Sequence, residues 1–391
     1  MKRNIHNNST VNGKNPISHN AWVEIDLSIL DNNIKELKKL LYPTTELCAV
    51  MKADAYGCGI DLCLPTIISN DIKYIGIGDN KEAKQVRELG FEHNIMRLRA
   101  ATINEIKNSL NYQIVELIGS YKQAKTINDI GIKYCIQIPF NLALNSGQMS
   151  RNGLNMSNNN AIEEACKIIK LPNLAIKGIM THYACDNKET IQKQLDDFKY
   201  SAFRIMDEAK LNYNDVKLHT ANSYSALHMP ETQLDIVRIG DALYENMGTK
   251  FSQFNDVFSL KTKVASIMEY SKGTPVGYKN KFVLKRNSKL ANLAIGFSNG
   301  YLKAFKNKGR VIINDNYANI IGEISMNTCM IDVTDFPNVL PGDEVVLYGK
   351  EKNKHINRKE VKEITDMEIF ELSVLWGKLN ARIAVHNKTL N

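Results

Sequence analysis

The sequence predicts an α/β protein, a (β/α)8 (TIM) barrel followed by a mainly antiparallel β domain. Eight strand-like apolar runs separated by stretches of helical period occupy the first part of the chain, and eight is the strand count of a closed barrel. Past about residue 249 the runs become shorter and are broken by Gly, Pro, Asn and Asp, which is typical of antiparallel strands joined by turns. A chain of 391 residues is long enough for two such domains.

The elements follow from their periodicity. A strand is predicted at 21–27 and an amphipathic helix in "LDNNIKELKKLLY" (30–42). Stretches such as "NKEAKQVRELG" (80–90) have helical spacing and separate the later strands. The eight barrel strands are expected at 46–52, 73–79, 94–100, 114–120, 133–140, 176–184, 216–223 and 236–240.

The change to shorter apolar runs past about residue 249 sets the expected domain boundary there. The strand at 21–27 precedes the eight barrel strands, so it is also a candidate for the sheet of the second domain. The predicted divisions are a flexible tail at 1–20, a barrel at 21–248 and a C-terminal β domain at 249–391.

Composition excludes several classes of partner. Fifty Lys and Arg residues against 42 Asp and Glu give a net charge of +8, but the basic residues are scattered, so no nucleic-acid partner is expected. The seven cysteines form no CxxC pair, which indicates neither a zinc site nor a disulfide framework and fits a reducing compartment. No window resembles a signal peptide or a membrane span. We therefore expect a cytoplasmic protein without a membrane partner, with the periplasm as the alternative if a leader was lost from this sequence.

"AVMKADAYGCG" (49–59) contains the first candidate for chemistry. Lys52 ends an apolar run that reads as a buried strand, and Gly57 and Gly59 punctuate the turn that follows. Ligands collect at the carboxyl ends of parallel strands, so a lysine there can take part in chemistry. It can also be a surface residue whose ammonium reaches solvent. The residues alone leave both interpretations open.

Polar residues also follow the other predicted strands. His182 can be a core histidine, and Asn222 and Ser223 can simply cap the next helix. The residues that stand at these strand ends are Lys52, Tyr56, Arg97, Arg99, Asn145 to Asn152, His182, Tyr183, Asn222, Ser223, Arg238 and Gly240.

Three arginines need partners. Arg238 lies inside the apolar run "DIVRIGDALY", where a buried guanidinium must be paired or face a ligand. Arg97 and Arg99 are two positions apart on a predicted strand, so both side chains are expected on the same face. Two cations on one face imply an anion.

Together these motifs resemble the alanine racemase family. "AVMKADAYGCG" is similar to the lysine motif with which that family binds pyridoxal phosphate (PLP). Further matches come in family order between about residues 21 and 382: "SRNG", "THYA", "HTANS", "VRIGDALY", "GYKNKF", "AIGFSNGY" and "SMNT". The set is specific as a whole, although several of its members would be weak alone.

The resemblance implies a PLP enzyme with two catalytic residues, Lys52 and Tyr278. Lys52 would bind PLP covalently, and Tyr278 would reach the barrel of a second subunit, so a homodimer with shared active sites is expected. Arg238 would face the pyridine nitrogen with His182 beside it. The implied cofactor-binding residues are Lys52, Tyr56, His182, Asn222, Ser223, Arg238, Ile239 and Gly240.

Two bases suit racemisation, which removes the α-proton from one face of a planar carbanion and returns one to the other. A lysine and a tyrosine ordinarily have pKa values of roughly 10, so cationic neighbours and desolvation would have to lower them. PLP would supply the electron sink.

Departures from ordinary alanine racemases concern specificity. Asn145 lies near the position where those enzymes carry a lysine that is often carbamylated. "SMNT" replaces a Cys-Met-Asp motif, and Phe297 replaces an entrance tyrosine. "RLRA", "NSGQMSRNG" and "SMNT" resemble the broad-specificity amino-acid racemases, so alanine, serine, methionine, lysine and arginine are expected substrates. The implied substrate-binding residues are Arg97, Arg99, Asn145, Arg151, Asn152, Met326 and Asn327.

Three alternatives stay open: an alanine-specific racemase, a PLP barrel decarboxylase of basic amino acids, and a PLP-carrying protein without turnover. The decarboxylase needs a catalytic cysteine in the β domain, where Cys329 is the candidate, but it lies in an apolar run typical of a buried thiol. The carrier would lack a β domain. We therefore favour the racemase.

Overall fold

The computed structural model describes residues 19–146, 149, 153–278 and 282–386. They form two compact units. The barrel unit comprises the described residues within 23–259, 357–378 and 382–386, and the β unit those within 19–22, 260–356 and 379–381. Each unit is described by itself.

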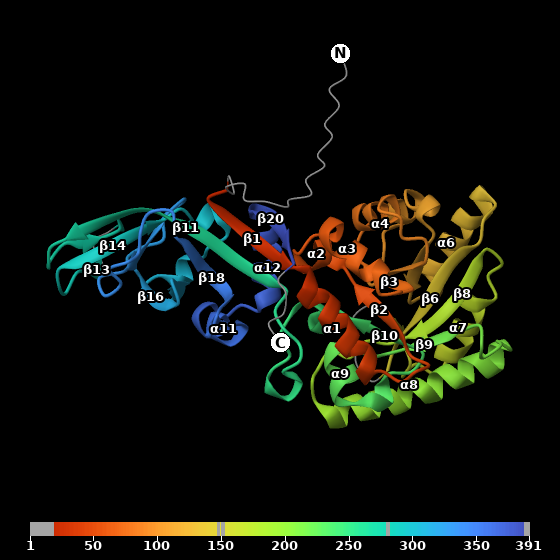
Figure 1. Ribbon diagram of the computed structural model, residues 1–391. Helices are drawn as coiled ribbons and strands as arrows, with labels where there is room; N and C mark the ends of the chain where they lie inside the picture. Colours follow the sequence, from red (N-terminus) through yellow and green to blue (C-terminus); the bar gives the residue numbers. More distant parts are fainter. Residues whose placement is uncertain (1–18, 147–148, 150–152, 279–281, 387–391) are drawn as a thin grey trace, which may run out of the picture. The chain divides into compact units, whose positions relative to one another are not determined.

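The barrel unit is built on eight parallel strands in the order β10-β2-β3-β4-β5-β6-β8-β9 (Figure 1). Backbone hydrogen bonds of 3.0 Å from Asp235 to Leu218 and from Arg238 to Ala221 connect the β9 and β10 segments, so the barrel is nearly closed. The strands are β2 (Glu46–Val50), β3 (Tyr74–Ile77), β4 (Asn94–Arg97), β5 (Ile114–Ile118), β6 (Ile138–Asn145), β8 (Leu174–Met180), β9 (Lys217–His219) and β10 (Ile236–Ile239). The predicted fold class is confirmed.

The strand predicted at 133–140 lies later in the structure. Helix α6 continues to Tyr134, and Cys135 ends it in the left-handed conformation with φ 54°, so β6 begins only at Ile138. Apolar residues continue from the end of the helix into the strand, interrupted by the single polar residues Lys133 and Gln137. This pattern hides the boundary between helix and strand. A short strand, β7 (Leu154–Asn155), pairs in parallel with the end of β6.

Helices follow the strands and lie around the outside of the parallel sheet (Figure 1). Side-chain caps fix several starts: Asp26 caps α1, and Asp79 forms a capping box with Glu82 at the start of α4. The helices are α1 (Leu27–Leu40), α2 (Lys52–Tyr56), α3 (Ile60–Ser69), α4 (Asn80–Glu88), α5 (Ile103–Lys107), α6 (Tyr121–Tyr134), α7 (Ala161–Ile169), α8 (Lys188–Ala209), α9 (Ser223–His228), α10 (Asp241–Tyr244), α11 (Arg358–Thr365) and α12 (Ile369–Leu379).

The β unit is an antiparallel sheet with the strand order β19-β18-β15-β16-β17-β14-β11 (Figure 1). Next in the order come β1 (Ala21–Asp26) and β20 (Ala381–Val385), whose residues divide between the two units. A separate hairpin pairs β12 (Pro275–Val276) with β13 (Phe282–Val283). The remaining strands are β11 (Phe258–Tyr270), β14 (Ser288–Leu293), β15 (Arg310–Ile313), β16 (Asn316–Ile321), β17 (Cys329–Asp332), β18 (Glu344–Glu351) and β19 (Lys354–Ile356).

The division differs from the expected one near the C-terminus. The expected β domain covered 249–391, whereas residues 357–378 belong to the barrel unit. The contacts of α12 give the physical reason. The Phe370 ring packs edge-on against Tyr56, with 5.1 Å between centroids, and Ser373 Oγ donates to the Tyr56 carbonyl at 2.9 Å. The packing of a late helix against an early part of the barrel leaves no local signal in the sequence.

Within the described residues, helices are too short or too polar to cross a membrane. All seven cysteines lie in this part of the chain and are free thiols.

Candidate active site

A cavity of about 850 Å³ in the barrel unit is lined by residues at and just beyond the carboxyl ends of barrel strands. It brings together seven of the eight residues predicted to bind the cofactor. The eighth, Ile239, is buried at the end of β10. The seven that line the cavity are Lys52, Tyr56, His182, Asn222, Ser223, Arg238 and Gly240.

Lys52 begins a tight turn that we call the lysine turn (Lys52–Tyr56). Its residues from Ala53 to Tyr56 all have φ between 54° and 57°, which is the left-handed region. The turn directs Lys52 and Tyr56 into the same cavity, and the Lys52 Nζ lies 5.8 Å from the centroid of the Tyr56 ring. Sequence reasoning predicted the strand end and the turn but missed the left-handed conformation, because Ala and Tyr carry no signal for it.

Tyr56 is packed on three sides. Its ring stacks on Tyr244 with 5.2 Å between centroids and meets the Phe370 ring edge-on. Its hydroxyl lies against Gly240, where an added Cβ would come within 2.2 Å of the Tyr56 Oη. Only glycine therefore fits at position 240, and the tyrosine hydroxyl is held against backbone at the start of α10.

Arg238 is buried and held by the barrel backbone. Its guanidinium donates to the carbonyl oxygens of His219, Thr181 and Thr220 at 2.8–2.9 Å. The Nδ1 atoms of His219 and His182 lie 2.9 Å and 3.4 Å from it. Because a guanidinium donates only, both rings accept at Nδ1. The predicted neighbours Arg238 and His182 are thus adjacent.

His219 is a site residue that the sequence reasoning did not select. Burial and the Arg238 charge lower its pKa well below the usual range, so the ring is neutral. The proton then lies on Nε2, which is buried and has no hydrogen-bond partner within the described residues. The quoted motif "HTANS" contains this histidine, but nothing in the residue pattern separates it from His182.

Asn222 caps α9, and Ser223 is the first residue of that helix. The Asn222 side chain accepts from the Ser225 N–H at 2.9 Å and caps α9. The Ser223 hydroxyl accepts from the N–H groups of Gly240 and Ala242, each at 3.3 Å. The capping alternative therefore holds for Asn222, while Ser223 joins the end of β10 to the cavity wall.

Asp241 and Arg358 extend the cavity wall and were also missed. The Arg358 Nη1 on α11 lies 3.5 Å from the Asp241 Oδ1 on α10. Burial raises the pKa of Asp241 to about 6, and the carboxylates of Glu368 and Asp186 act in the same direction while Arg358 opposes them. The two residues are far apart in sequence, so no local pattern could have paired them.

The expectation that Arg97 and Arg99 leave the same face of one strand is wrong. Strand β4 ends at Arg97, so Arg99 lies beyond it. Arg97 is buried and makes two hydrogen bonds with the Glu116 carboxylate, at 2.7 Å and 3.0 Å. Arg99 is half-exposed and pairs with Glu105, whose pKa it lowers to about 2. The two arginines do not share one anion: Arg97 pairs with Glu116, and Arg99 pairs with Glu105.

The other predicted substrate residues that the structure describes divide between the two units. Asn145 ends β6 and donates to the Gly153 carbonyl at 3.1 Å. In the β unit, Met326 is exposed, and the Asn327 side chain donates to the Ser298 hydroxyl at 2.9 Å. Arg151 and Asn152 lie outside the described residues.

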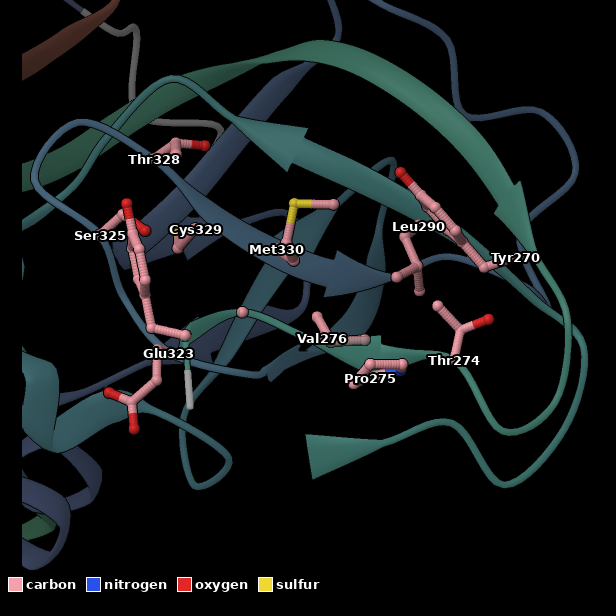
Figure 2. Close-up of a pocket in the computed structure, with 12 residues that line it drawn as sticks. Tyr270, Thr274, Pro275, Val276, Leu290, Glu323, Ser325, Thr328, Cys329 and Met330 are labelled. Carbon is pink, nitrogen blue, oxygen red and sulfur yellow. The ribbon is translucent and has the colours of Figure 1, made fainter. Parts of the chain in front are cut away.

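Tyr278 belongs to the β unit, where it lines a cavity of about 430 Å³. Its side chain is 70% exposed. Figure 2 shows the wall of this cavity, with Val276 from β12 and Cys329 and Met330 from β17. Burial raises the pKa of the Cys329 thiol to about 12. This thiol is therefore protonated and unsuited to the decarboxylase chemistry weighed above.

Comparisons with known proteins agree with this geometry. Residues 25–247 match the family model "Alanine racemase, N-terminal domain", and residues 257–384 match "Alanine racemase, C-terminal domain". The broad specificity amino-acid racemase of Vibrio vulnificus (strain CMCP6) is 42% identical over 98% of this chain and 93% of its own length. The lysine racemase of Proteus mirabilis is 40% identical over 94% of this chain and 90% of its own.

Solved structures extend the likeness to the fold. The alanine racemase of Bartonella henselae with covalently bound pyridoxal phosphate has a TM-score of 0.83 and 26% identity, covering 94% of this chain and 99% of its own. The alanine racemase of Clostridium difficile 630 has a TM-score of 0.88 at 24% identity, over 95% of this chain and 97% of its own. The chain belongs to the alanine racemase family.

Proposed function

We propose that this chain is a PLP-dependent amino-acid racemase of broad specificity, which interconverts the L and D forms of alanine and of other amino acids without a β-branch. The observation that carries the proposal is the cavity in which Lys52, Tyr56 and Arg238 meet, in a chain 42% identical to a broad specificity amino-acid racemase.

The residues of the cavity fit PLP. Gly240 and Tyr56 leave no room for a side chain between them, and a hydroxyl, an amide and backbone N–H groups gather there as a phosphate site requires. Arg238 would face the pyridine nitrogen, where its permanent charge disfavours protonation. Bound PLP would supply the electron sink for the α-carbanion.

Lys52 and Tyr278 would handle the protons. Lys52 Nζ takes the α-proton from one face of the substrate or returns it there, and the Tyr278 hydroxyl serves the opposite face. An exposed Tyr278 is suited to act on another molecule, which supports a homodimer in which each site uses Lys52 of one subunit and the tyrosine of the other.

The expected substrates include basic amino acids. A cationic side chain would be repelled by Arg97 and Arg99 unless carboxylates balance them, and Glu116 and Glu105 do so. Two exchanges widen the entrance in this proposal: Asn327 in place of an acidic residue, and Phe297 in place of a tyrosine. Valine is excluded because its Cβ substituents crowd the α-carbon that both bases must approach.

The test is kcat/KM for L-alanine, L-lysine and L-valine, measured as formation of the D-enantiomer by the PLP-loaded enzyme. We expect turnover of alanine and lysine, and no formation of D-valine above the blank. Lys52→Ala is the blank. Activity confined to alanine would replace the proposal by an alanine-specific racemase, which the 31% identity to alanine racemase 1 of Clostridium acetobutylicum also supports.

A cytoplasmic site of action goes with this proposal. Seven free thiols within the described residues fit a reducing compartment. Fractionation of the native host with an antibody to the chain tests it, and recovery in the periplasmic fraction would contradict it.

A further inference from the structure

We propose that Glu82 is a positioning residue that holds the lysine turn in its left-handed conformation and so sets the direction of Lys52. The inference deepens the proposed function, since it rests on Lys52 as the catalytic lysine.

The turn needs a brace. Ala53, Asp54, Ala55 and Tyr56 are four successive non-glycine residues with φ of 54–57°. The left-handed region places the Cβ of an L-residue too close to the next carbonyl oxygen, so such residues enter it singly and not as a run. A run of four persists only where its surroundings fix it.

Glu82 supplies backbone contacts on both sides. Its Oε1 accepts from the Asp54 N–H at 3.1 Å, inside the turn. Its Oε2 accepts from the Gly78 N–H at 2.6 Å, just beyond β3, and from the Asp79 N–H at 3.3 Å. The residue is only 7% exposed. One carboxylate therefore joins the turn to the end of the neighbouring barrel strand.

The carboxylate and the stem of the lysine both lie close to Gly78. A Cβ placed on Gly78 would be 3.4 Å from Glu82 Oε2 and 3.6 Å from Lys52 Cβ. Gly78, whose N–H donates to Glu82, is therefore also a neighbour of the Lys52 stem. Burial raises the pKa of Glu82, while the N–H groups of Gly78 and Asp54 favour its ionised form.

Helix capping alone does not account for these contacts. A capping box needs the Glu82 carboxylate to accept from the Asp79 N–H, and it needs Asp79 Oδ1 to accept from the Glu82 N–H, here at 3.0 Å. It does not need the shorter bond to Gly78 or the bond to Asp54. The Asp54 carboxylate binds elsewhere, to the Ile60 N–H at 2.9 Å and to Arg382. The turn backbone is contacted by Glu82 at the Asp54 N–H and by Ser373 at the Tyr56 carbonyl, and Glu82 is the contact that joins it to the end of β3.

Glu82→Gln is the direct test. The Asp54 and Gly78 N–H groups donate to different oxygens of Glu82. In a carboxamide one of these two positions is an NH2 donor, which opposes one of the two N–H groups. In the full chain freed of PLP, we expect backbone amides 53–57 to exchange hydrogen about tenfold faster than in the wild type. Asp79→Ala is the matched control, because it removes the α4 cap without removing the Asp54 contact, and it should speed exchange only at the start of α4. If Glu82→Gln shows that same restricted pattern, the proposal is overturned.

Two further measurements keep the test decisive. PLP affinity, followed by fluorescence titration, should fall about tenfold in Glu82→Gln. Adding Ala53→Gly to that variant should restore part of the affinity, since glycine adopts positive φ without strain.

If Glu82→Gln does not fold, Glu82→Asp keeps the charge but is one methylene shorter, and it should show the same exchange pattern more weakly. Unchanged exchange at 53–57 in that variant also overturns the proposal. Faster exchange in a chain without racemase activity would contradict the proposed function and leave the bracing role intact.

Discussion

The lysine turn and the segment that carries Tyr278 would supply the two bases, and the chain holds them very differently. The turn is bound to Glu82, to Ser373 and to Arg382, and its tyrosine is packed between two rings. Tyr278 follows the two-residue strand β12 and is 70% exposed. One base is thus fixed by its own chain, and the other is presented outward. We expect this contrast if the active site is shared between subunits, as proposed above.

The largest effect is expected at the fixed base. Lys52→Ala removes the amine that would bind PLP and move the proton on one face, so kcat should fall by at least about 10³-fold. Visible absorbance of the PLP-loaded protein and D-alanine formation measure the two losses. Wild-type absorbance in the purified variant would show that another lysine binds the cofactor.

The next effect concerns the outward base. Tyr278→Phe keeps the ring and removes the hydroxyl, so kcat should fall by about 10²- to 10⁴-fold. Mixing equal amounts of Lys52→Ala and Tyr278→Phe subunits should restore about a quarter of the wild-type activity, because half of the dimers are then mixed and each has one intact site. Light scattering and a tagged subunit monitor dimer formation and exchange. No recovery after proven exchange would place both bases within one chain.

The sequence predicted most of the barrel for a physical reason. Parallel strands buried on both faces need continuous apolar runs, and these are visible without any alignment. The ends of the runs also indicated where polar residues gather, and seven of them line one cavity. The boundary between α6 and β6 was misplaced because both are apolar there.

What was missed depends on contacts between distant residues. Arg97 looks like a ligand-binding cation until Glu116 on the next strand is placed beside it. Three further side chains contact residues that are distant in sequence. His219 lies 19 residues from its partner Arg238, Arg358 lies 117 from Asp241, and Glu82 lies 28 from Asp54. Neither periodicity nor a capping signal specifies such pairs, so only the fold reveals them.

Two glycines with nearly the same positive φ test how closely the surrounding atoms pack in each region. Gly57, directly after the lysine turn, has φ 86°, and an added Cβ would be 2.2 Å from the Ser373 carbonyl oxygen. Gly273, just before β12, has φ 89° and nothing within 4 Å of such a Cβ. Gly273→Ala should therefore cost about 1–2 kcal/mol of unfolding free energy from strain alone, and Gly57→Ala about 2–5 kcal/mol, because overpacking adds to the strain.

Chemical denaturation of the chain freed of PLP measures both variants. PLP affinity should fall in Gly57→Ala and stay unchanged in Gly273→Ala. Equal losses of stability would mean that the packing of α12 against the turn is looser than the contacts indicate.

The smallest expected effect is the pH dependence of stability, which differs in sign between Asp241 and Glu105. Asp241, on the cavity wall, has its pKa raised by burial from 3.8 to about 6. Between these values the folded chain binds more proton than the unfolded chain, so this residue makes stability fall as pH rises from about 4 to about 6, after which the contribution is constant. The Asp241 side chain is 29% exposed, and solvent screening leaves about 1–2 kcal/mol of its effect on the free energy of unfolding.

Glu105, paired with Arg99, has its pKa lowered to about 2. Its contribution to stability therefore has the opposite sign and is lost as pH falls below about 4.5. Denaturation of the PLP-free chain at about pH 2 to 7 should show that Asp241→Asn gains stability relative to the wild type as pH rises from about 4 to about 6. Glu105→Gln should lose its stability deficit relative to the wild type as pH falls from about 4.5 to about 2. A difference between wild type and Asp241→Asn that does not change across this range would mean that Arg358 and solvent balance the buried carboxylate fully.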